Sequence, residues 1–131
     1  MAAGTVLVIE DNTIQRVELA TTLQRRGFRV LTATDGNEAL NCLTNGPVPD
    51  IILLDMLIPY GDYDGWWFLR QRQRIPALTE VPVVILTSLS DASEEWAASL
   101  DAAGVIRKPF EVETLLAEIR HCLSYQDVQG T

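Results

Sequence analysis

Short apolar runs alternate along the chain with longer stretches in which apolar residues recur at helical spacing. Continuous apolar runs are typical of strands that are buried on both faces of a parallel sheet. We predict five strands, at residues 5–11, 28–33, 51–55, 81–88 and 105–108. The run at 28–33 alternates apolar and polar residues, which indicates a half-buried strand at the edge of the sheet.

The stretches between these runs are predicted to be helices, at residues 14–26, 35–43, 66–73, 91–104 and 111–125. The apolar face assigned to the first helix comprises Ile14, Val17, Leu19, Ala20 and Leu23. Strands that alternate with helices imply an α/β fold, in which helices cover both faces of a parallel sheet. We expect one domain over residues 1–131, with its core at about 5–124 and a frayed tail at 125–131.

Charged and hydroxyl side chains stand at the C-terminal ends of four predicted strands. They are Glu10 and Asp11, Asp55, Thr87 and Ser88, and Lys108. In such sheets, ligands bind at the carboxyl ends of the strands. Three carboxylates that converge there repel one another, and Mg²⁺ with oxygen ligands would relieve that repulsion. A lysine and a hydroxyl suit a phosphoryl group, and a carboxylate can accept one.

Taken singly, these residues have simpler interpretations. Asp55 could merely end a strand, and Glu10 with Asp11 could cap a helix. Lys108 alone could be a solvated lysine. The hypothesis of a phosphoryl site therefore depends on the whole set.

The composition adds limits on the partners. Apolar residues make up 47% and charged residues 21%, as in globular proteins. The net charge of −8 disfavours nucleic acid or a membrane surface as a direct partner. No apolar run approaches the roughly 20 residues of a membrane helix, and no signal peptide is visible. Cys42 and Cys122 are interpreted as buried free thiols, which indicates a reducing, cytoplasmic setting.

Four motifs resemble the receiver domain of two-component response regulators. They are VLVIEDN, IILLD followed by Pro59, VVILTS, and RKPF. The resemblance extends from about Thr5 to Leu123. It implies a flavodoxin-like, doubly wound sheet of five parallel strands in the order 2-1-3-4-5, with five helices.

The resemblance also implies a role for each site residue. Asp55 would accept the phosphoryl group. Mg²⁺ would be bound by Asp11, Asp55 and the backbone carbonyl of Leu57, and by Glu10 through water. Thr87, Ser88 and Lys108 would contact the phosphoryl group, and the bond before Pro109 would be cis.

The chain departs from the family between Asp55 and the next helix, where the loop is about two residues longer than usual. Tyr60, Tyr63, Trp66 and Trp67 in and after this loop are candidates for contact with a partner. Adjacent helix positions diverge by about 100°, so Trp66 and Trp67 cannot both face the core. A tryptophan that lies on its own domain is the alternative interpretation.

A second departure is Val105, which replaces the aromatic residue that reports phosphorylation in most receivers. In the family, the side chains two residues past the phospho-acceptor and two past the threonine flank the water that approaches the phosphoryl group, and the resemblance places Leu57 and Leu89 there. Neither can bond a water, so we expect slow self-dephosphorylation.

The leading hypothesis is a signalling switch rather than a conventional enzyme. A histidine kinase or phosphotransfer protein would donate a phosphoryl group to Asp55. The domain would then change its contacts with a downstream protein, or with a second copy in a homodimer. Two alternatives stay open: a receiver fragment of a larger hybrid kinase or effector protein, and a pseudo-receiver that is never phosphorylated. A phosphatase is disfavoured because Leu57 stands where a second carboxylate would be needed.

Overall fold

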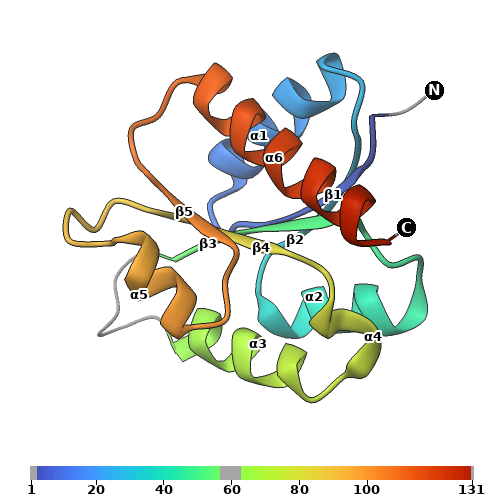
Figure 1. The fold of residues 1–131 in the computed structure, drawn as a ribbon. Helices are drawn as coiled ribbons and strands as arrows, with labels where there is room; N and C mark the ends of the chain where they lie inside the picture. Colours follow the sequence, from blue (N-terminus) through green and yellow to red (C-terminus); the bar gives the residue numbers. More distant parts are fainter. Residues whose placement is uncertain (1–2, 57–62, 131) are drawn as a thin grey trace.

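The structure is a computed structural model that describes residues 3–56 and 63–130, without the side chains of residues 63, 64 and 125–130. Its centre is a sheet of parallel strands in the order β2-β1-β3-β4-β5 (Figure 1). The strands are β1 (Thr5–Ile9), β2 (Arg29–Ala33), β3 (Ile51–Asp55), β4 (Val83–Thr87) and β5 (Gly104–Arg107). The predicted fold class and strand order are confirmed.

Helices cover both faces of the sheet. They are α1 (Thr13–Arg25), α2 (Gly36–Asn45), α3 (Tyr63–Gln73), α4 (Pro76–Thr79), α5 (Glu94–Ser99) and α6 (Val112–Gly130). Figure 1 shows α1 and α6 on one face and the other four on the opposite face. The described residues thus contain one helix more than the five predicted. The addition is α4, a single turn with proline at its N-terminus, where the missing N–H costs nothing.

The sheet divides the apolar interior into two cores. Leu7 and Ile9 of β1 point into the α2–α5 core, which α2, α3, α4 and α5 cover. Val6 and Val8 point into the α1–α6 core on the other face. Successive side chains of a strand alternate between faces, so the continuous apolar runs seen in the sequence fill both cores.

The predicted apolar face of α1 is wrong at two positions. Ile14 is 70% exposed and Val17 is 54% exposed, whereas Leu23 is fully buried. At 100° per residue, Ile14 lies about 180° and Val17 about 120° around the helix from Leu23. Only Leu19 and Leu23 reach the α1–α6 core.

The last two helices also differ from the predicted lengths. The fourth predicted helix, 91–104, is reduced to Glu94–Ser99. Ser93 caps its start by accepting a hydrogen bond from the N–H of Trp96, and Asp101 stops it with a φ of 60°. The final helix runs to Gly130 rather than to residue 125, because the intervening residues contain no proline or glycine.

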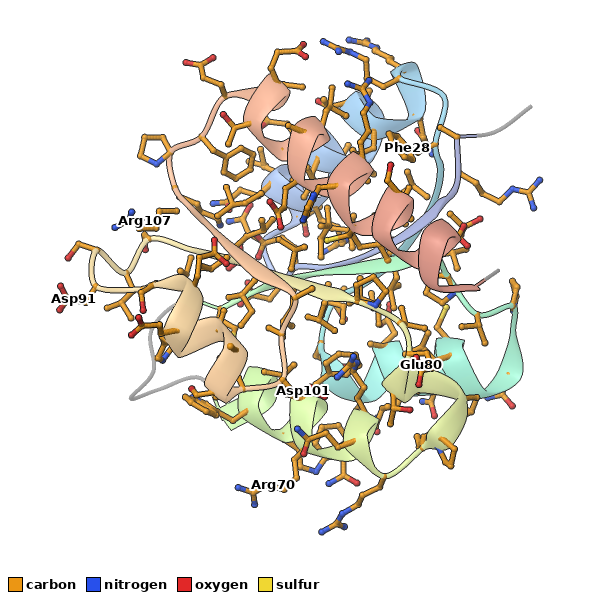
Figure 2. The ribbon with its side chains drawn as sticks, in the orientation of Figure 1. Phe28, Arg70, Glu80, Asp91, Asp101 and Arg107 are labelled. Carbon is orange, nitrogen blue, oxygen red and sulfur yellow. The ribbon has the colours of Figure 1, made fainter. Side chains whose placement is uncertain are left out.

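A buried arginine ties α3 to two neighbouring turns. Arg72 is 3% exposed. Its guanidinium donates to the carbonyl of Thr79 at 3.2 Å, to that of Val81 at 2.6 Å and to the carboxylate of Asp101 at 3.2 Å. Figure 2 labels Asp101 in the turn between α5 and β5. Backbone oxygens and one ion pair thus satisfy both terminal nitrogens of the buried guanidinium, whereas its Nε has no hydrogen-bond partner among the described residues.

Candidate functional site

Asp55 is the last residue of β3, and its carboxylate reaches the C-terminal edge of the sheet. The side chain is 5% exposed, yet it is not left unpaired. The ammonium of Lys108 donates to its Oδ2. A buried carboxylate needs such a partner to remain ionised. This ion pair explains how an aspartate can follow four buried apolar residues.

Lys108 follows β5 directly and is held in place at both ends. Its backbone N–H donates to the carbonyl of Thr87 at 2.7 Å, and the Lys108–Pro109 peptide bond is cis, as the resemblance implied. At the other end, Nζ lies 3.6 Å from Oε1 of Glu10 and 3.0 Å from Oε1 of Gln15. The ammonium therefore has three oxygen neighbours, contributed by three different elements of the fold.

Glu10 follows β1 and carries the second buried carboxyl group, at 4% exposure. Its Oε2 accepts a hydrogen bond from the N–H of Asn12 at 3.2 Å, and its backbone carbonyl accepts one from Arg16 at 3.0 Å. Burial, and then the neighbouring Asp55 carboxyl, raise the pKa of Glu10. Asp11 is exposed, and its contact with the Glu10 carboxyl, with burial second, raises its pKa too.

The capping interpretation of Glu10 and Asp11 does not hold. Asn12 caps α1 instead, because its side chain accepts the N–H of Gln15 at 2.9 Å. The two acidic side chains therefore do not cap the helix; Glu10 contacts Asp55, and Asp11 contacts Glu10.

The acidic residues fit a hard cation by their donor chemistry. Glu10, Asp11 and Asp55 offer carboxylate oxygens, the ligands that Mg²⁺ prefers. The raised pKa values of Glu10 and Asp11 show that the ionised state of these two groups is disfavoured, and a bound cation would favour it. Within residues 3–56 and 63–130, no three acidic, histidine or cysteine side chains form a ready-made metal cluster. A cation bound here would need water or backbone ligands as well. Leu57, the expected backbone ligand, lies outside the described residues.

Thr87 and Ser88 end β4 next to this group. Thr87 is 1% exposed, and its Oγ1 accepts a hydrogen bond from the N–H of Leu89 at 3.1 Å. Because the oxygen accepts there, the hydroxyl proton remains available to a further acceptor. The loop that follows is tied to β5, since Arg107 donates to the carbonyl of Ser90 at 2.9 Å. Figure 2 shows Arg107 on the side of the molecule where this loop lies.

A pocket of about 580 Å³ opens over the site between α1 and the segment from β5 to α6. Its polar end contains Glu10, Asp55, Ser88 and Lys108. Leu19, Phe110 and Leu115 are among the residues of its apolar wall. The carboxylate of Asp55 therefore lies at a pocket that has room for a small ligand.

The two tryptophans among the candidate partner contacts face different sides of α3, as helical geometry requires. Trp66 packs against the α2–α5 core, whereas Trp67 is 40% exposed. Tyr60 and the side chain of Tyr63 lie outside the described part of the chain. Val105 packs, partly buried, against the α2–α5 core.

Two residues near the site were not predicted from the sequence, namely Gln15 and Arg16. Both lie in the first turn of α1, immediately after the acidic end of β1. The first turn of a helix that follows a parallel strand faces the carboxyl edge of the sheet. That position was the signal that could have identified them.

Comparison with known proteins gives the family. Residues 6–120 match the response regulator receiver domain. The chain is 35% identical to the phosphate regulon transcriptional regulatory protein PhoB of Escherichia coli over 120 residues, which cover 90% of this chain and 51% of that protein. It spans about half the length of the transcriptional regulators that it matches.

Two solved structures are similar over nearly their full length. The chemotaxis protein CheY4 of Vibrio cholerae has a TM-score of 0.79 at 31% identity, covering 94% of this chain and 99% of that one. The signal receiver domain of a histidine kinase from Syntrophus aciditrophicus has a TM-score of 0.79 at 31% identity, covering 93% and 91%. The family match, the strand order and the acidic edge of the sheet agree with one another. The chain therefore belongs to the response regulator receiver domain family of two-component systems.

Proposed function

We propose that this receiver domain accepts a phosphoryl group on Asp55 and passes the signal on through altered protein contacts. The observation that carries the proposal is the buried Asp55 carboxylate at the end of β3, paired with Lys108 and crowded by Glu10. Receiver domains act as signalling switches rather than as conventional enzymes, and a histidine kinase is the natural donor.

The chemistry follows from the positions of these groups. An oxygen of the Asp55 carboxylate attacks phosphorus and forms a new P–O bond, while the P–N bond of a phosphohistidine breaks. The electron pair of that bond stays on the imidazole, which takes up a proton. Bound by Asp11 and Asp55, with Glu10 acting through water, Mg²⁺ would neutralise the charge that gathers on the phosphoryl oxygens.

Two side chains of the site would hold the transferred group. The Lys108 ammonium exchanges the Asp55 oxygen for a phosphoryl oxygen, so its charge stays paired throughout. The Thr87 side chain would turn to donate its hydroxyl proton to a second phosphoryl oxygen, and this rotation would break its hydrogen bond with the N–H of Leu89. That exchange would disturb the loop after β4, which Arg107 links to β5. Since Val105 offers no aromatic ring, this loop is the better candidate for the readout.

The partners that we propose for this domain are inferred from its family, because the net charge only indicates which surfaces the domain itself would not bind. PhoB is by name a transcriptional regulator, CheY4 a chemotaxis protein, and the Syntrophus domain part of a histidine kinase. The expectation that nucleic acid is excluded therefore applies to this acidic domain and not to a longer protein that contains it. Trp67, an exposed aromatic residue of α3, is our candidate contact for the kinase or the target.

We place the switch in the cytoplasm, where two-component phosphoryl transfer takes place. None of the helices in the described residues is long and apolar enough to span a membrane.

The direct test is incubation of the protein with Mg²⁺ and acetyl phosphate, followed by measurement of its intact mass. The wild type should gain one phosphoryl mass that disappears when a chelator replaces Mg²⁺. Asp55→Asn should gain none, whereas Asp91→Asn, the same change at an exposed loop residue, should be phosphorylated normally. An Asp55→Asn protein that gains the mass to the same extent as the wild type would refute the assignment.

A further inference from the structure

Gln15 contacts the lysine of the site although it belongs to neither a strand end nor the acidic group. Its Oε1 lies 3.0 Å from Nζ of Lys108, a normal hydrogen-bond distance. The two residues are 93 positions apart in the sequence. The contact joins α1 to the segment that follows β5, across the opening of the pocket.

The backbone of Gln15 is fixed, so its side chain starts from a defined position near Lys108. Its N–H donates to Oδ1 of Asn12 in the cap of α1. The next residue, Arg16, donates to the backbone carbonyl of Glu10 at 3.0 Å. The first turn of α1 is thus tied to the acidic edge of the sheet on both sides of Gln15.

The number of donors on Lys108 gives Gln15 a distinct role. An ammonium has three N–H donors, and Lys108 has three oxygen neighbours, on Asp55, Glu10 and Gln15. Two of these oxygens belong to carboxylates, whereas the amide oxygen of Gln15 carries no full charge. An uncharged acceptor can hold the ammonium without competing with the charge of an incoming phosphoryl group.

We infer that Gln15 is a positioning residue, which holds the Lys108 ammonium over Asp55 while that ammonium exchanges a carboxylate for a phosphoryl oxygen. The inference rests on the proposed phosphorylation of Asp55. Without the amide oxygen, the long lysine side chain is restrained on one side only, and part of its preorganisation is lost. The Gln15 oxygen supplies that restraint from a helix, which moves less than a loop.

The test compares Gln15→Met with Gln24→Met in the full chain. Methionine matches glutamine in length and in helix propensity but lacks the amide oxygen. Gln24 is an exposed residue of the same helix, and its replacement controls for the general effect of the change. The readouts are the second-order rate constant for phosphorylation by acetyl phosphate with Mg²⁺, and the ¹³Cε chemical shift of Lys108 without any donor.

Gln15→Met should slow phosphorylation about five-fold, as expected for the loss of one hydrogen bond with a net value near 1 kcal/mol. It should also shift the Lys108 signal, and Gln24→Met should do neither. In a Lys108→Met background, Gln15→Met should have no further effect, because the residue acts through the lysine.

A rate within two-fold of the wild type would overturn the positioning role and leave the proposed function intact. An equal slowing in the Lys108→Met background would also overturn it. A wild-type protein that gains no phosphoryl mass would overturn the proposed function, and the role of Gln15 with it.

Discussion

Replacing Asp11 by asparagine should stabilise the domain when no divalent cation is present. The Asp11 carboxyl is exposed and contacts that of Glu10, which is buried beside Asp55. Asparagine keeps the shape and removes the charge, so one like-charge contact is relieved. Asp55→Asn is not an equivalent test of this repulsion, because Asp55 also accepts a hydrogen bond from the Lys108 ammonium and the substitution would weaken that ion pair.

The expected gain can be worked out from the exposure of Asp11. Two unit charges about 4 Å apart interact by about 1 kcal/mol in water, the appropriate medium for an exposed carboxylate. Unfolding entropy is about 2.1 cal/mol/K per residue, so 131 residues give roughly 0.28 kcal/mol/K. The melting temperature should therefore rise by about 4 °C.

The pH dependence of this gain has a definite sign. The pKa values of Glu10 and Asp11 are raised in the folded state above their ordinary values of 4.5 and 3.8. The folded protein therefore binds more protons than the unfolded chain, and stability falls as the pH rises through these pKa values. The gain from Asp11→Asn should be full at neutral pH and shrink toward about pH 4.

The assay is thermal unfolding, followed by circular dichroism in a chelating buffer at several pH values. Asp91→Asn supplies the same charge change at an exposed site and should leave the melting temperature within about 1 °C. Mg²⁺ should stabilise the wild type more than Asp11→Asn, because the variant lacks one ligand. A lower melting temperature for Asp11→Asn at neutral pH without Mg²⁺ would refute the account of the acidic crowding.

Two further predictions concern the lifetime of the signal and the choice of partner. Leu89→Glu should speed loss of the phosphoryl group by about 5- to 150-fold, because a carboxylate can bond the attacking water. The decay of phosphoryl mass after donor removal measures this, with Ser90→Glu as the matched control, and equal decay in all three proteins would exclude the role. Trp67→Ala should leave phosphorylation by acetyl phosphate unchanged but weaken binding to the cognate kinase or target in a titration. An unaltered affinity would show that Trp67 is only a surface residue of its own domain.

The parallel α/β fold and the grouping of the site residues were predictable from short-range patterns, whereas the strand order came from the resemblance to receiver domains. The apolar runs are buried on both faces, and a parallel arrangement places every strand end at one edge of the sheet. The acidic, hydroxyl and lysine residues at those ends could therefore be grouped from their positions along the chain. The assignment of individual roles came from the resemblance to receiver domains.

Other features depend on contacts that no local pattern records. The apolar character of Ile14 and Val17 predicts their burial, but no neighbouring element within the described residues covers their side of α1. Arg72 lies in a polar stretch of α3, and the turns around Thr79, Val81 and Asp101 provide the oxygens that allow its burial. The Gln15–Lys108 bond joins residues 93 positions apart, so its geometry requires the assembled sheet.

The composition of the α1–α6 core has a consequence for the order in which the domain can form. Val6 and Val8 of β1 and Leu53 of β3 are covered by Leu115 and Ile119 of α6, near the opposite end of the described chain. At about 5–20 residues per second, the ribosome needs roughly 3–12 s to extend the chain from the end of β3 to these covering residues. Throughout that interval α1 alone covers this face of the nascent sheet, and the part that α6 will cover lies open to water. Newly made chains should therefore depend on chaperones for this face until α6 emerges and closes it.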